Sequence, residues 1–454
     1  MDQKEKLQEL STKILTIIAT YKDGSIQSHP FDIAKDLQDL RDIDTSLYKS
    51  MCKKIPSELF AQILVNMPTY IQEEITDIIS EQKVAKVTSS MDSDDASELI
   101  YNISQKDENA AQTVLSKLTA KDKQNIEELN AYEDNQAGAF MQKELFSVSI
   151  EESIGEALKR LKVQKDLNIL HDIFHAFLVD KENKYIGSIG LEELILFERT
   201  QTFQEIPEDK IEHYSFNDKE DISDAVSMFD NYNLNSLAIL NSDSKLLGRV
   251  THDDIRNIMQ EQDTKQLYSL AGVNDKAEEE ESIFKIGRTR AFWLSINLIT
   301  AILASLVIGL FDATIQSLVA LAVLMPIVAS MGGNAGTQTL TVTVRQMALG
   351  SIEYDDAKKT IIKEVIISLG NGLIFAFVIG VIAYFWFNIP LLGFVIAISM
   401  IINLVGAGFF GAVIPLVLEK FNIDPAIGST VILTTVTDIV GFFSFLGLAT
   451  LILL

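Results

Sequence analysis

The sequence predicts a multidomain protein with an all-α domain of helical repeats, a tandem α/β pair and an α-helical membrane domain of five helices. Helix-start signals recur up to about residue 137, one strand and helix pattern then occurs twice, and long apolar runs fill the last part of the chain. Charge divides the chain near residue 290, since residues 1–290 hold 33 Lys and Arg against 55 Asp and Glu, and residues 291–454 hold five against eight. An acidic soluble body, which repels nucleic acid and attracts divalent cations, should therefore precede a membrane body.

Residues 1–137 are expected to form a stacked helical array. Pro or small polar residues stand before apolar stripes of 3.6-residue period, as at Pro56 and Pro68. The regular recurrence of such helix starts is typical of stacked helical repeats. The densest acidic group consists of four residues: Asp92, Asp94, Asp95 and Glu98. Helix capping explains two of these acids, so capping and metal binding both stay open for the group.

The soluble part shows no catalytic or disulfide pattern. Cys52 is the only cysteine, so no intrachain disulfide can form, which fits a reducing cytosol. The histidines show no strong zinc spacing, because the stretch around His171 and His175 reads as strand. The first residues contain no apolar h-region, so no cleaved signal peptide is expected. We expect that the protein is not an enzyme.

One pattern of a helix, a strand and a glycine-containing strand occurs twice, in residues 138–203 and 204–262. The second copy follows the spacing strand–Gly–strand–Thr–x–x–Asp–Ile with these residues: Gly248, Thr251, Asp254 and Ile255. In the first copy, Gly190 and Glu193 replace the Thr and the Asp. This pattern resembles a tandem pair of cystathionine β-synthase (CBS) modules. The resemblance implies that ATP or another adenine nucleotide binds between the modules, with Asp254 holding the ribose.

Residues 263–290 are expected to hold a connecting helix and a linker, with a polar helix over 260–272 and four glutamates at 278–281. Five apolar runs, each long enough to cross a bilayer, comprise residues 291–311, 315–344, 361–387, 391–418 and 427–454. Basic residues lie in the second and fourth connections between these runs: Arg345, Lys358, Lys359, Lys363 and Lys420. The positive-inside rule then predicts a multi-pass protein of the cytoplasmic (inner) membrane, with the soluble body in the cytoplasm and the C-terminus outside.

Two features of the membrane domain predict an ion path. Residues 326–343 place polar side chains and glycines at membrane depth, among them Asn334, Thr337 and Gln338. Irregular backbone at that depth is tolerated only where it is buried or lines water, so we interpret this stretch as a wall of an ion path. Asp438 is the only charge of the last apolar run and lies near the bilayer middle. A carboxylate there needs a partner, water or a cation, so we predict a cation site.

The whole pattern resembles the MgtE-type magnesium channel and transporter family from end to end. It combines acidic helical repeats, a CBS pair, a connecting helix and the motif Pro-Ile-Val-Ala-Ser-Met-Gly-Gly-Asn-Ala-Gly-Thr-Gln at 326–338. The last run adds further matching residues: Asp424, Pro425, Ala426, Ser429, Thr435, Asp438 and Gly441. The resemblance implies a Mg²⁺-selective channel that is a homodimer in the lipid bilayer. Its pore would lie at the subunit interface and close when internal Mg²⁺ is plentiful, and Mn²⁺ or Co²⁺ would also pass.

Two sets of candidate metal ligands follow. The pore candidates are Asp438, Asn334, Gly332 through its carbonyl, Thr337 and Thr435. For Gly332, close helix packing is the alternative role. The cytosolic regulatory candidates are Asp94, Asp95, Glu98, Asp224, Asp253, Asp254, Glu261 and Asp263. The family is usually denser in acids after the second CBS strand, where this chain has Asn257, Gln262 and Lys265, so weaker or shifted gating by Mg²⁺ is expected. Thr430 and Val431 also stand where the family usually has Asn-Pro.

Other functions explain part of the sequence. A proton-coupled secondary transporter for divalent cations is the alternative function, since Asp438 can carry a proton, although five spans do not divide into two inverted repeats. An intramembrane aspartyl protease needs two facing carboxylates, and Asp438 stands alone at membrane depth. A membrane-anchored nucleotide sensor, in which the spans only dimerise, predicts no ion flux.

Overall fold

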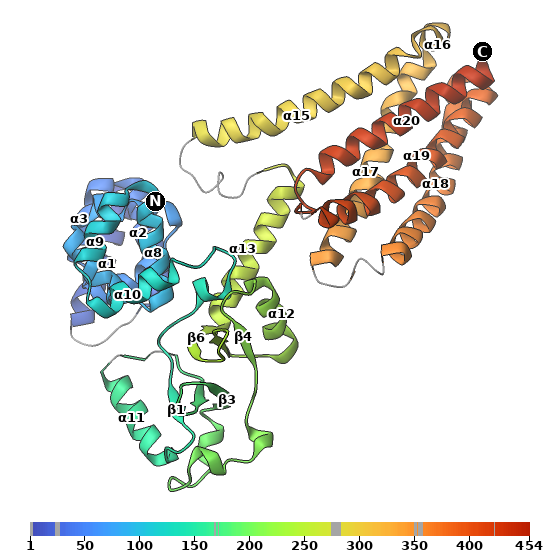
Figure 1. Cartoon of the computed structure of the whole chain (residues 1–454). Coiled ribbons are helices and arrows are strands. Elements are labelled where there is room, and N and C mark those ends of the chain that lie inside the picture. Colours follow the sequence, from blue (N-terminus) through green and yellow to red (C-terminus); the bar gives the residue numbers. More distant parts are fainter. Residues whose placement is uncertain are drawn as a thin grey trace. The chain divides into compact units, whose positions relative to one another are not determined.

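Figure 1 shows a computed structural model of the chain. The structure describes residues 3–22, 28–167, 169–170, 172–273, 283–348, 352, 357–421 and 423–454. The chain divides into two compact units, Met1–Gln260 and Glu261–Leu454. The expected linker glutamates at 278–281 lie outside the described residues.

The first part of unit 1 is all-α, as the sequence predicts. Its described helices are α1 Gln3–Lys22, α2 Pro30–Ile43, α3 Thr45–Lys54, α4 Ser57–Val65, α5 Thr69–Glu73, α6 Ile75–Ile78, α7 Glu81–Thr88, α8 Ser93–Lys106, α9 Glu108–Ser116 and α10 Ala120–Leu129. Small polar residues cap several of them. Asp44 Oδ1 accepts a hydrogen bond from the amide of Leu47 (2.9 Å), and Thr119 Oγ1 accepts one from the amide of Asp122 (3.2 Å). Such caps satisfy amides that have no partner inside the helix.

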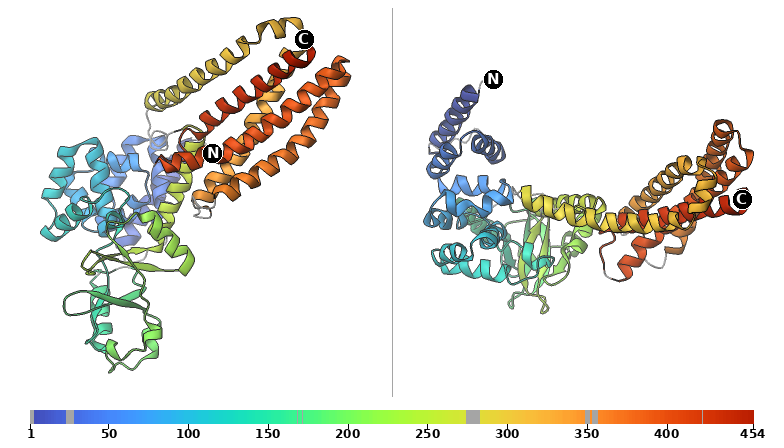
Figure 2. Two further views of the ribbon diagram at one scale, coloured as in Figure 1. Left: turned by 45° about the vertical axis from the view of Figure 1, so that its right-hand side comes forward. Right: turned by 90° about the horizontal axis from the view of Figure 1, so that it is seen from above.

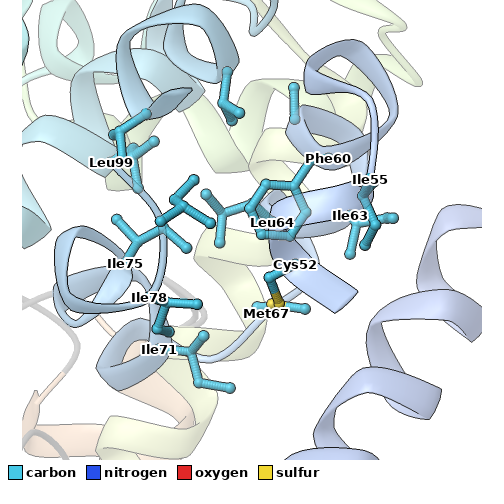
Figure 3. Close-up of a cluster of buried hydrophobic side chains, with 14 of the residues drawn as sticks. Cys52, Ile55, Phe60, Ile63, Leu64, Met67, Ile71, Ile75, Ile78 and Leu99 are labelled. Carbon is cyan, nitrogen blue, oxygen red and sulfur yellow. The ribbon is translucent and has the colours of Figure 1, made fainter. Parts of the chain in front are cut away.

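An apolar core holds this helical array together. Figure 3 shows side chains of α4, α6 and α8 meeting in it, among them Phe60, Leu64 and Leu99. Cys52 is buried in the same core, and burial raises the pKa of its thiol to about 12. Because thiolates rather than thiols are reactive, Cys52 is a packing residue. Lys83 Nζ closes the end of α3 by donating to three carbonyl oxygens, including that of Ile55 (2.6 Å).

The second part of unit 1 contains the expected repeated module. The first copy comprises β1 Ser147–Ser149, α11 Ile154–Asp166, β2 His175–Val179 and β3 Tyr185–Gly190. The second comprises β4 Ser215–Asn217, α12 Ile222–Tyr232, β5 Ser236–Leu240 and β6 Leu246–Thr251. Short 3₁₀ turns η1 Ala137–Phe140, η2 Glu193–Leu196, η3 Phe203–Glu205 and η4 Glu208–Lys210 connect these elements.

The two copies share one topology. In each sheet the first strand pairs in parallel with the second, and the second pairs antiparallel with the third. The register shifts at the same place in both copies, before Val179 in the first and before Leu240 in the second. Phe177, Val179, Ala238 and Leu246 form one apolar cluster between the sheets. The tandem pair predicted from the sequence is therefore present.

Unit 2 is α-helical. Its elements are the end of α13 (His252–Leu270), α15 Ile283–Gly309, α16 Asp312–Ser317, α17 Ala320–Ala348, α18 Ala357–Phe387, α19 Pro390–Lys420 and α20 Ser429–Leu453. Among the described residues, five helices are long and apolar enough to cross a membrane: α15, α17, α18, α19 and α20. The views of Figures 1 and 2 show α17, α18, α19 and α20 running side by side. The expected five-helix membrane domain is thus confirmed.

Two details differ from expectation. The polar helix expected over 260–272 begins at His252, because no helix-breaking residue stands between the second CBS strand and Leu270. This helix therefore crosses the expected boundary at residue 262. The irregular backbone expected in residues 326–343 is a continuous helix, α17, which contains Pro326. A helix satisfies its own backbone hydrogen bonds in lipid, and Gly332 and Gly336 allow close packing against neighbouring helices.

Candidate functional site

One face of α17 carries polar side chains that the other described residues leave exposed. Ser330, Asn334 and Gln338 follow one another at four-residue spacing and are all exposed, so they lie on the same face of the helix. Asn334 Nδ2 lies 3.4 Å from Ser330 Oγ, while Thr337 is half-buried beside this face. Hydroxyl and amide oxygens are ligands that suit Mg²⁺ or its water shell. α17 thus presents a polar stripe along a membrane helix.

Asp438 lies on α20 and is half-buried. Among the described residues, no Lys, Arg or His forms an ion pair with its carboxylate. Thr435, nearly one turn earlier, donates its hydroxyl proton to the carbonyl of Val431 (2.7 Å) and keeps its oxygen lone pairs as acceptors. A carboxylate and an oxygen acceptor are therefore available on successive turns of α20 without a protein cation beside them.

The pore candidate Gly332 is buried inside the protomer. A Cβ built on Gly332 would overlap the side-chain amide of Asn403 in α19. A Cβ on Gly336, one turn later, would lie 3.1 Å from Leu433 of α20. Both glycines therefore let α17 approach its neighbours, which was the alternative role considered for Gly332. Its carbonyl as a metal ligand stays a prediction.

Several buried polar residues of the membrane helices were not predicted from the sequence, among them Asn403 and Glu364. Asn403 is fully buried and donates from Nδ2 to the carbonyl of Val328 (2.7 Å). Glu364 of α18 is also buried and accepts a hydrogen bond from Thr339 Oγ1 of α17 (3.2 Å). Asn403 stands in an apolar run, whereas Glu364 directly follows Lys363 at the start of one, so the sequence offers little signal for either residue.

The regulatory candidates Asp94 and Asp95 lie in the first turn of α8, and Asp254 lies in the first turn of α13. The structure brings them together around Gln142, whose Nε2 lies 3.1 Å from Asp94 Oδ2 and 3.5 Å from Asp254 Oδ2. Burial, and then the neighbouring carboxylates, raise the pKa of Asp94 well above its ordinary value and that of Asp95 to about 8. Burial likewise raises the pKa of Asp254 to about 6. Ionisation of these three carboxylates therefore lowers the stability of the folded protein.

The other regulatory candidates are distributed unevenly. Glu98 and Asp253 are close enough to raise the pKa of Asp95, so they belong to the same cluster. Asp224 and Glu261 are exposed on helices α12 and α13. Asp263 pairs with Arg345 of α17 (2.8 Å), so it already has a cationic partner. In the described part of the chain, no three His, Cys, Asp or Glu side chains are arranged as a ready metal site. An ion at the cluster would therefore draw the carboxylates together or bind through water.

The expected ribose-binding residue, Asp254, forms hydrogen bonds within its own segment at the start of α13. Its Oδ2 accepts hydrogen bonds from the amide of Thr251 (3.2 Å) and from the Thr251 hydroxyl. Nearby, the guanidinium of Arg249 is buried and donates to Gln142 Oε1 (3.0 Å) and to the carbonyl of Asp172 (2.9 Å). Asp254 therefore takes part in the acidic cluster, and its ribose contact stays a prediction.

The end of α13 contacts the helices that carry the polar stripe and Asp438. Besides the Asp263–Arg345 pair, Thr430 Oγ1 of α20 donates to the carbonyl of Leu270, the last residue of α13 (2.7 Å). Leu270 also packs against an apolar cluster of α17, α19 and α20. α13 thus contacts both α17 and α20 at its end.

Three families of known protein domains match segments of the chain. The model of the MgtE divalent cation transporter domain matches residues 325–448, the MgtE intracellular N domain matches 28–135, and CBS domains match 137–199 and 210–261. The magnesium transporter MgtE of Enterococcus faecalis is 30% identical over 328 residues, which cover 72% of this chain and 71% of the relative.

Two further relatives bear the same name. The magnesium transporter MgtE of Thermus thermophilus is 25% identical over 363 residues, covering 79% of each chain. That of Bacillus subtilis is 25% identical over 453 residues, covering 96% of each chain. With the acidic helical array, the repeated module and the five membrane helices in place, the chain belongs to the MgtE family of divalent cation transporters.

Proposed function

We propose that this protein is a homodimeric Mg²⁺ channel of the cytoplasmic membrane that intracellular Mg²⁺ closes. The observation that carries this proposal is the exposed stripe of Ser330, Asn334 and Gln338 on α17, together with Asp438 on α20. Polar groups at membrane depth are costly in lipid and usually line a pathway. The relatives named magnesium transporters support Mg²⁺ as the ion that passes.

A second copy of the chain would cover the polar stripe. In a two-fold dimer the same surface meets itself, so two stripes and two Asp438 carboxylates would surround one path. Mg²⁺ gives up its octahedral water shell reluctantly and is held by few carboxylates plus water. Two Asp438 carboxylates, with Asn334, Thr337 and Thr435 toward the water shell, suit a hydrated ion. Mn²⁺ and Co²⁺ would pass the same site.

The acidic cluster and α13 supply the gate. Asp94, Asp95 and Asp254 repel one another when ionised, and Mg²⁺ bound among them removes this repulsion. A compact cytosolic body would therefore be favoured at high internal Mg²⁺. Because α13 runs unbroken from Asp254 to Leu270, a shift of its first turn would reach Thr430 and α20. With amides or lysine at Asn257, Gln262 and Lys265, we expect this gate to need more Mg²⁺.

Two further features belong to the same proposal. ATP or another adenine nucleotide is proposed to bind at the CBS pair, with Asp254 as its ribose ligand. The soluble body would lie in the cytoplasm and the C-terminus outside the cell, because Arg345 and Lys420 lie at the ends of membrane helices on the side of the connecting helix.

Uptake of Mg²⁺ into proteoliposomes tests the channel. We expect uptake by the wild type without an imposed proton gradient, and a loss of at least about tenfold with Asp438→Ala, because the site loses its carboxylates. Asp312→Ala serves as the matched control, since Asp312 lies in α16 outside the spans. Uptake that needs a proton gradient would instead show a coupled transporter. No uptake even without internal Mg²⁺ would favour a sensor.

A further inference from the structure

Asn403 is a polar side chain at the junction of three membrane helices. It lies in α19 with none of its surface exposed, and its Nδ2 donates a hydrogen bond of 2.7 Å to the carbonyl of Val328 in α17. Val328 stands one helical turn before Gly332. The amide of Asn403 is therefore tied to the backbone of the helix that carries the polar stripe.

Two glycines make room for this amide, one on each pore helix. A Cβ on Gly332 of α17 would overlap Asn403 Nδ2 and lie 2.8 Å from Asn403 Cγ. A Cβ on Gly441 of α20 would lie 2.9 Å from the same Nδ2 and 3.3 Å from Val328 Cγ1. Carbon atoms do not normally approach that closely, so any side chain at either position would displace the amide. The side chain of Asn403 thus separates α17 from α20 at the level of Gly332 and Gly441.

Packing alone does not explain an amide at this position. Asn403 Oδ1 is buried and has no hydrogen-bond partner among the described residues. A buried carbonyl oxygen without a partner is costly, whereas leucine has the same branching at Cγ, although its methyl groups are larger, and would leave nothing unsatisfied. The hydrogen bond to Val328, which leucine cannot make, is the property that asparagine adds.

We propose that Asn403 is a positioning residue of the permeation path. By holding the Gly332 turn of α17 and the Gly441 turn of α20 at one distance, it sets where Asp438 stands relative to Asn334. Asp438 lies three residues before Gly441, and Asn334 lies two residues after Gly332. This inference rests on the proposed channel function, and it identifies a residue outside the predicted ion ligands.

Loss of this spacing should affect Mg²⁺ more than Mn²⁺. Mg²⁺ demands nearly ideal octahedral geometry and dehydrates reluctantly, so a displaced carboxylate is a poorer match for it. We expect Asn403→Leu to lower Mg²⁺ uptake and to raise the ratio of Mn²⁺ to Mg²⁺ uptake by roughly threefold to tenfold, which corresponds to the coupling typical of contacting residues. Leucine is bulkier than asparagine, so the melting temperature of each variant is measured alongside uptake to identify a packing defect.

The test measures Mg²⁺ and Mn²⁺ uptake into proteoliposomes and thermal unfolding of the same full-length variants. Gly332→Ala should raise the Mn²⁺ to Mg²⁺ ratio in the same direction as Asn403→Leu, because its methyl group displaces the amide. Gly370→Ala is the matched control, since a Cβ at Gly370 of α18 would have no other atom within 4 Å. Asn403→Ala and the double variant Gly332→Ala with Asn403→Ala complete the set. The change in the ion ratio of the double variant should be smaller than the sum of the changes in the two single variants, because both substitutions act on one contact.

Three outcomes are decisive. A raised ratio of Mn²⁺ to Mg²⁺ uptake that Asn403→Leu and Gly332→Ala share, and that Gly370→Ala lacks, supports the positioning role. An unchanged ion ratio, or simply additive effects in the double variant, overturns it even if total uptake falls, because a merely structural residue lowers the amount of active protein without altering its selectivity. A wild type that takes up no Mg²⁺ contradicts the proposed channel function itself, and the positioning role falls with it.

Discussion

Asp94, Asp95 and Asp254 carry charge where burial disfavours it. Their pKa values are raised in the folded state, to about 8 for Asp95 and about 6 for Asp254. A raised pKa means that the folded protein binds these protons more tightly than the unfolded chain does. The resulting stability is complete below about pH 4, the ordinary pKa, and is lost as the pH rises through these values. At neutral pH the cluster therefore favours binding of either protons or cations.

The variant Asp95→Asn tests this balance. Without Mg²⁺ at pH 8, we expect the variant to be more stable than the wild type by about 1–2 kcal/mol, because it removes one buried charge. At pH 5 the difference should shrink, since Asp95 is then protonated in the wild type. Thermal unfolding of the full-length protein in detergent, followed at both pH values, measures this.

Mg²⁺ provides the second arm of the same measurement. It should stabilise the wild type at pH 8 more than it stabilises Asp95→Asn, because the variant lacks one ligand. Asp224→Asn removes an exposed acid of α12 outside the cluster and should match the wild type throughout. An equal response of all three proteins to pH and Mg²⁺ would show that the cluster does not govern stability.

The helix α13 carries part of the acidic cluster at its start and contacts α17 and α20 at its end. Its first turn carries Asp253 and Asp254, and its last residue accepts the hydrogen bond from Thr430. Between these ends it buries Ile255 and Ile258, and Asp263 pairs with Arg345 of α17. Its function as a lever would depend on an unbroken helix.

Breaking α13 in the middle should separate gating from conduction. Lys265→Pro removes one helical hydrogen bond and costs roughly 3 kcal/mol in a helix interior. We expect Mg²⁺ uptake into proteoliposomes to persist but to lose its inhibition by internal Mg²⁺. Lys265→Ala at the same exposed position keeps the helix and should retain inhibition. Inhibition that survives Lys265→Pro would show that the end of α13, with its contact between Leu270 and Thr430, does not transmit the signal.

The assembly as a whole is expected to be a two-fold dimer, because the described residues of one chain leave the stripe of Ser330, Asn334 and Gln338 exposed. The dimer can be tested by disulfide cross-linking, because the chain contains a single cysteine. Cys52 is the only cysteine and is buried, with its thiol pKa raised to about 12, so it does not interfere with thiol chemistry elsewhere.

Asn334→Cys should form a covalent dimer under mild oxidation in the membrane, because a two-fold axis beside the stripe brings the two introduced thiols together. Denaturing electrophoresis without reductant measures it. The wild type, whose single thiol is buried, should stay monomeric under the same treatment. A variant that also stays monomeric would place the stripe away from the contact between copies.

Local patterns predicted much of this protein. The charge division, the tandem modules and the five apolar runs each depend on residues near one another in the chain, so the sequence alone predicted the all-α array, the CBS pair and the membrane domain. Asp438 also stood out because an isolated carboxylate within an apolar run is visible without any structure. The prediction for residues 326–343 was wrong. The glycines and polar residues of this stretch predicted irregular backbone, but the stretch is part of the helix α17, in which Gly332 and Gly336 allow close packing.

Contacts between distant residues were decided only by the tertiary structure. Asn403 lies in the apolar run 391–418, and nothing near it in the sequence indicates that it contacts Gly332 and Gly441 of two other helices. The same is true of Asp94 and Asp254, which were known as acids but not as neighbours. Helix periodicity shows which face of an element is apolar, whereas the partner of a buried polar group depends on how the helices cross. That crossing is set by side-chain packing over the whole domain, which no local stretch of sequence contains.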